Sequence, residues 1–148
     1  MDTVGLWSLV RFLHVIGAVL WVGGQLALTL VVLPLARRML AADARDRFAA
    51  AAGRRFGLLT GIVFLPLQLG TGWAMAWHRG VTWASLADPG YGRTLATKLG
   101  LFVLVMLAAA GHGIAYAKGR AELARALAVI SLVGSLGVVL LAAALPAT

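Results

Sequence analysis

Four long apolar stretches constrain the fold of this 148-residue chain more than any other feature. They are residues 12–36, 56–77, 99–117 and 126–145. A helix that crosses a hydrocarbon core of about 30 Å needs roughly 20 predominantly apolar residues. Only 12% of the residues are charged, against about 25% in soluble domains. We therefore predict one all-α integral membrane domain, with short connections that favour an up-down-up-down four-helix bundle.

Basic residues predict how the chain crosses the membrane. The connection after the first stretch carries Arg37, Arg38, Arg45, Arg47, Arg54 and Arg55, and the last connection carries Lys118, Arg120 and Arg125. Cytoplasmic loops are enriched in such residues, so we expect these loops in the cytoplasm and both termini outside the cytoplasmic (inner) membrane. The net charge of +8 then reflects topology, and no nucleic-acid partner is predicted. The first apolar stretch exceeds the roughly 7–15 residues of a signal peptide, which predicts a retained anchor.

The connections between the stretches have contrasting compositions. The Ala-rich segment 42–56 predicts a helix that extends the second span into the cytoplasm. The outer segment 78–93 contains Asp88-Pro89-Gly90, which is typical of turns, and its Trp83 and Leu86 could fold it over the bundle as a lid. Without cysteines, the chain forms no disulfide, thiolate metal site or iron–sulfur cluster.

Two glutamines lie inside apolar stretches, where a buried amide needs a partner. Counted at ~1.5 Å per residue from the inner ends of their spans, Gln25 and Gln68 both fall near the midplane. We therefore expect the two amides to lie within hydrogen-bond reach, directly or through a water. The alternative is that they line a substrate path.

His14, Trp21 and Gln25 share one helix face, because their spacing returns to within about 40° on a helix. That face is expected to point into the bundle, near the outer surface for His14. Arg11 lies one turn above His14 and Lys98 opens the third span at the same outer level.

Met75 and His78 close the second span at that level, so they are further candidate ligands beside His14. His112 lies ~20 Å below Leu99, too deep to share an ion with His14. We expect it to be a structural histidine, hydrogen-bonded to a backbone carbonyl or to Tyr116.

The first span resembles the membrane families of copper-resistance protein D (CopD) and of the protoporphyrinogen oxidase HemJ. The shared pattern is His14, then Trp21-Val22-Gly23-Gly24, followed by the Arg-rich "GRRFGLLTGIVFLPLQLGTG" and by "TKLGLFVL" at the third span. It covers about three of the four spans. "TLVVLP" lacks the aromatic and histidine residues expected of HemJ, so the whole pattern is closer to CopD-like proteins.

Three functions follow as hypotheses. In the first, His14 is an axial ligand of haem b with a redox or porphyrin-related role, and the second ligand is His78, Met75 or none. Trp21 then belongs to the cofactor-binding residues, and Arg11 and Lys98 pair with the propionates. In the second, which the CopD resemblance implies, the chain binds or takes up copper, and His14, His78 and Met75 are the candidate metal ligands. In the third it is a cofactor-free scaffold or transport subunit.

Either cofactor would require an electron-transfer or copper-handling partner besides the lipid bilayer. A homo-oligomer is left open, and so is an enzymatic role, since all five acidic residues lie outside the apolar stretches.

Overall fold

The computed structural model describes residues 5–145, and each regular element within that range is helical. Four helical segments are long and apolar enough to span a membrane: Leu6–Met39, Ala42–His78, Tyr91–Ala117 and Ala121–Ala144. The predicted helical class and the four apolar segments are confirmed, and each helical segment begins before its predicted start. The Ala-rich connection is helical and continuous with the second segment, as expected.

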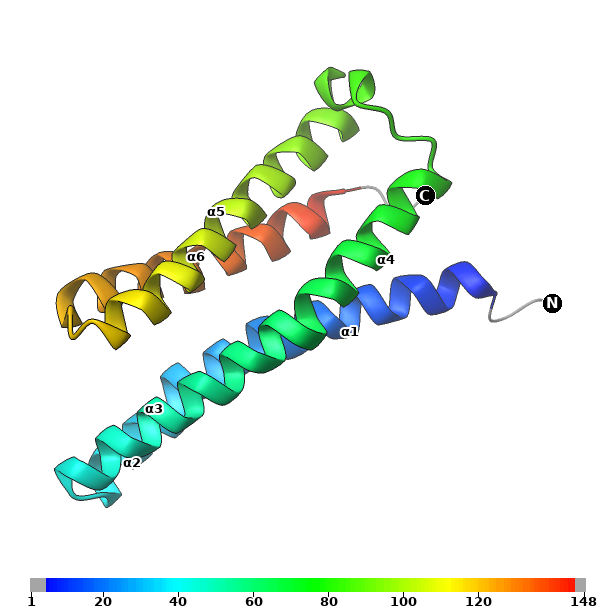
Figure 1. Ribbon diagram of the computed structural model, residues 1–148. Helices are drawn as coiled ribbons and strands as arrows, with labels where there is room; N and C mark the ends of the chain where they lie inside the picture. The colour runs from blue at the N-terminus through cyan, green and yellow to red at the C-terminus, as the bar shows by residue number, and fades with distance from the viewer. Residues whose placement is uncertain (1–4, 146–148) are drawn as a thin grey trace. The chain divides into compact units, whose positions relative to one another are not determined.

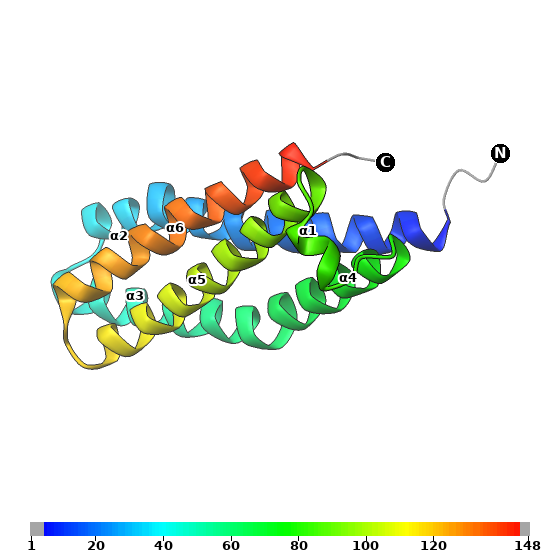
Figure 2. The ribbon, with the colours of Figure 1, turned by 90° about the horizontal axis from the view of Figure 1, so that it is seen from above.

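The chain divides into two compact units, with the boundary between Arg79 and Gly80. Each unit contains two long antiparallel helical segments (Figures 1 and 2).

In the first unit two long helical rods are joined by a turn at Leu40–Ala41. The first rod consists of α1 (Leu6–Ala27), the π-helical segment η1 (Leu28–Val32) and α2 (Leu33–Met39). The second rod consists of α3 (Ala42–Leu59), the π-helical segment η2 (Thr60–Phe64) and α4 (Leu65–His78).

Both π-helical segments end two residues before a proline, Pro34 in the first rod and Pro66 in the second. A proline inside a helix has no N–H to donate, and its ring clashes with the carbonyl four residues earlier. A π-type turn widens the backbone at that point and accommodates the ring. The local sequences "VVLPL" and "VFLPL" thus give the same local form in the two rods.

The second unit is a hairpin of α5 (Tyr91–Ala117) and α6 (Ala121–Ala144), preceded by the short 3-10 helix η3 (Ala84–Ala87). Gly119, at φ +69°, ends α5 in a left-handed conformation and lets the chain reverse. Val105 is 1% exposed and packs on Gly134, where a side chain would overlap the valine methyl group. The helices therefore approach closely through small residues.

The segment that precedes α5 folds back on this helix. Gly92, in the first turn of α5, lies directly against the carbonyl of Ser85 in η3. Trp83 is 90% exposed at the start of this short helix. The expected lid over the bundle stays a prediction.

Candidate functional site

His14 on α1 is held by two polar side chains of α4. Its Nδ1 lies 2.9 Å from the hydroxyl of Thr71, and that hydroxyl donates to the carbonyl of Leu67 at 2.5 Å. Because a hydroxyl has only one hydrogen, Thr71 must accept from His14, so Nδ1 is the protonated nitrogen. The lone pair of the neutral imidazole then resides on Nε2, which is the nitrogen through which a ligating histidine can bind a metal.

The backbone of His14 is bound as well. The amide nitrogen of Gln68 donates to the carbonyl of His14 at 2.6 Å. Gln68 and Thr71 are 8% and 9% exposed, and their spacing of three residues places both on the face of α4 that meets α1. We call His14, Gln68 and Thr71 the polar clamp.

Two glycines make room for the polar clamp. A Cβ atom on Gly17 would lie 2.6 Å from the amide nitrogen of Gln68, and one on Gly72 would lie 3.4 Å from Cε1 of His14. At both positions the neighbour that an added Cβ atom would meet is a member of the clamp.

Trp21 lies further along the same face of α1, where it is 5% exposed. Its ring stacks on Phe64, with centroids 4.8 Å apart and planes at 11°. Trp21, expected to be a cofactor-binding residue, thus forms a buried apolar contact with Phe64 next to the polar clamp.

The expected contact between Gln25 and Gln68 is wrong in register. Gln68 meets Gly17 and the backbone of His14, so it lies about 12 Å along the helix axis from the level of Gln25. Counting depth from span ends failed because the predicted inner ends, residues 36 and 56, do not lie at one level. Phe56 packs on Gly24, which places the charged end of α3 beside the middle of the first rod.

One aromatic contact lies at the end of the first unit where α1 begins and α4 ends. Trp7 stacks on His78 with centroids 3.7 Å apart. Trp7 and His14 are separated by two helical turns, about 10 Å, whereas two nitrogens on one ion lie roughly 4 Å apart. His14 and His78 are therefore not brought together as a ligand pair.

The remaining predicted site residues lie on the helices as follows, and the structure does not bring them together into one site. Met75 is half-buried on α4, one turn beyond Thr71, and Arg11 is exposed one turn before His14. Lys98 belongs to α5 in the second unit, and its convergence with His14 stays a prediction. Within residues 5–145, no group of three or more His, Asp or Glu side chains could hold a metal ion.

His112 has the structural role that was expected. Its Nδ1 donates to the carbonyl of Ala124 on α6 at 2.8 Å, and its ring lies 6.4 Å from that of Tyr116. This bond joins the last turns of α5 to the first turn of α6.

Thr71 and Phe64 are the site residues that sequence reasoning missed. The signal for Thr71 was a hydroxyl between two glycines, "GTG", three residues after a buried glutamine. Phe64 gave no signal, because one aromatic residue in an apolar helix is common.

Comparison with protein-family models, with characterised proteins and with solved structures found no match to this chain.

Proposed function

We propose that this chain is an integral protein of the inner membrane that binds haem b through His14, with a redox or porphyrin-related role. The helical segments, of 24 to 37 residues, and the exposed apolar side chains along them support membrane insertion. The arginine distribution supports an up-down-up-down bundle with both termini outside.

The single observation that carries the haem proposal is the hydrogen bond between His14 and Thr71. Histidines that bind iron or other metals typically donate their second ring nitrogen to an acceptor, which fixes the tautomer and ring orientation and raises the basicity of the ligand. Thr71 has this relation to His14, and Gln68 fixes the backbone from which the imidazole projects.

One imidazole fits the needs of haem, because the porphyrin supplies the other four iron ligands and a single protein ligand can suffice. Bound haem would supply an iron centre able to accept and donate one electron. The chain would orient its imidazole through Thr71, and Arg11 and Lys98 remain our candidates for the propionates.

Copper is supported less well. A copper ion held by protein alone needs several ligands on one point, and His14 and His78 lie at levels about 10 Å apart along the hairpin. Only the resemblance to CopD-like proteins favours this function.

The test is the absorption spectrum of the purified protein, oxidised and reduced, for the wild type, His14→Ala and His112→Ala. We expect a Soret band in the wild type and in His112→Ala, and its loss in His14→Ala. His112→Ala is a matched control because it also removes one imidazole and one interhelical bond. A wild type without haem that binds copper would replace the proposal by the copper function.

A further inference from the structure

The part of the first hairpin nearest its turn pairs an apolar helix with a charged one. We call residues 28–39 and 42–55 the basal hairpin. Its first helical segment is predominantly apolar down to Ala36. The side chains of Leu30 and Val31 are 67% and 53% exposed. Its second, α3, carries four arginines and two aspartates over the same length. Such a pair has one side that needs apolar cover and one that needs water or headgroups.

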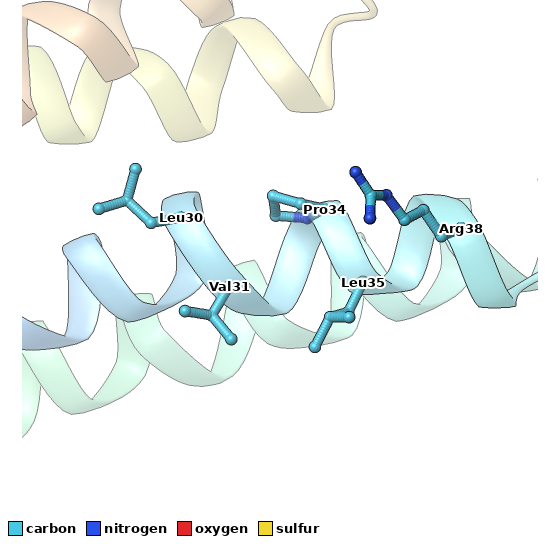
Figure 3. Close-up of a pocket in the computed structure, with 5 residues that line it drawn as sticks. All are labelled: Leu30, Val31, Pro34, Leu35 and Arg38. Atoms are coloured by element: carbon cyan, nitrogen blue, oxygen red, sulfur yellow. The ribbon is translucent and has the colours of Figure 1, made fainter.

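A groove of about 280 Å³ lies on the apolar side (Figure 3). Its lining is Leu30, Val31, Pro34, Leu35 and Arg38. In Figure 3, Leu30 and Pro34 lie along one edge of the rod and Val31 and Leu35 along another, and the guanidinium of Arg38 stands at one end. The groove has no polar side chain apart from Arg38 at this end. It is therefore complementary to an apolar chain that carries an anionic head.

Arg38, at the end of the groove, has no carboxylate partner among the described residues, whereas two arginines of α3 do. Asp43 pairs with Arg47 at 3.1 Å and Asp46 with Arg45 at 3.5 Å, both on α3 itself. Over residues 5–145, Arg38 has no carboxylate partner, and the same is true of Arg37, Arg54 and Arg55. The excess positive charge therefore remains available to an anion.

We propose that this groove binds an anionic phospholipid of the inner leaflet, with an acyl chain along Leu30 and Pro34 and the phosphate on Arg38. This inference rests on the membrane insertion proposed above. From Leu30 to Arg38 the groove runs about 12 Å, enough for the part of one acyl chain that lies next to the headgroup. Arginine forms strong charge-assisted bonds to phosphate, and the cytoplasmic leaflet presents anionic lipids to basic segments.

The second rod contains an internal comparison. The same proline-centred form recurs there around Ile62, Val63, Pro66 and Leu67, but Gly70 stands at the position that corresponds to Arg38. An anionic headgroup would find no cation at that point, so selectivity for anionic lipid is expected only at the first site.

The experiment starts from carbonate-washed membranes and uses the purified full chain. Native mass spectrometry measures retention of dioleoylphosphatidylglycerol and of dioleoylphosphatidylcholine by the wild type, Arg38→Gln, Arg38→Lys and Arg55→Gln. Arg55→Gln is the matched control, because it removes the same charge from the same basal hairpin away from the groove. Far-UV circular dichroism checks that each variant remains helical.

We expect the wild type to prefer phosphatidylglycerol and Arg38→Gln to weaken its binding about fivefold, the effect of one arginine near a membrane surface. Arg38→Lys and Arg55→Gln should stay within about twofold of the wild type. Equal loss in Arg38→Gln and Arg55→Gln, no preference for the anionic lipid, or its displacement by millimolar inorganic phosphate would each overturn the inference. Release of the chain by carbonate would overturn membrane insertion and this inference together. A haem spectrum on the same samples tests His14 separately.

Discussion

The hydroxyl of Thr71 decides which nitrogen of His14 carries the proton. Since this hydroxyl donates its only hydrogen to the carbonyl of Leu67, the imidazole must donate from Nδ1, and the lone pair of the neutral ring lies on Nε2. Two interhelical bonds to residue 14, one to the ring and one to the backbone, restrict both the position and the rotation of the ring. A ligand that is already oriented loses little freedom on binding.

Thr71→Val should therefore weaken haem binding while leaving the fold intact. Loss of such an outer partner typically lowers affinity by about 10–100-fold. Thr71→Ser keeps the hydroxyl and should remain within about threefold of the wild type. The measurement is a haem titration of apoprotein followed at the Soret band. Equal binding by Thr71→Val and the wild type would remove Thr71 from the site.

At the scale of the helical elements, the sequence predicted which segments are helical but not how they are registered. The length and composition of the apolar stretches predict the helices. The Ala-rich segment was also correctly predicted to extend the second span, as α3 (Ala42–Leu59) does. Register depends on which side chains interlock across the interface, such as Phe56 on Gly24 and Gln68 on Gly17. Those contacts follow from three-dimensional packing, and so the predicted Gln25–Gln68 pair was wrong.

His112 could be predicted where Thr71 could not. A histidine in an apolar helix has few partners apart from a backbone carbonyl, and the carbonyl of Ala124 fills that role. A threonine in a helix can instead satisfy its hydroxyl on its own backbone, as Thr71 does with Leu67. Its second role, as acceptor for His14, depends on the partner helix.

Gly134→Ala should destabilise the hairpin of α5 and α6. The added methyl group would meet Val105, which is 1% exposed and cannot move freely, so we expect a loss of about 1–3 kcal/mol. Gly113→Ala, where the added group meets nothing within 4 Å, is the control and should be neutral or stabilising. Thermal unfolding in detergent compares them, and equal midpoints would contradict the close packing.

At the scale of the whole molecule, the proposed topology follows from the distribution of arginines. Because the chain lacks cysteine, a single introduced thiol reports its own location without background. Ala51, on α3, and Ala87, in the outer connection, are both exposed.

In intact cells, Ala87→Cys should react with a membrane-impermeant maleimide, whereas Ala51→Cys should react only after the cells are opened. The reason is that the Arg-rich connection is expected in the cytoplasm. The reverse pattern would invert the proposed topology and place the groove of Arg38 in the outer leaflet.

The most direct test of His14 as the iron ligand is chemical rescue of His14→Gly by free imidazole. Removal of the side chain should abolish the Soret band of the purified protein, and added imidazole should restore it by occupying the place beside Thr71. His112→Gly should keep its Soret band without imidazole, because the ring of His112 donates a hydrogen bond to the carbonyl of Ala124 and is not an iron ligand in this proposal. If His14→Gly retains the wild-type spectrum, or if imidazole restores nothing in a variant that still folds, His14 does not ligate haem.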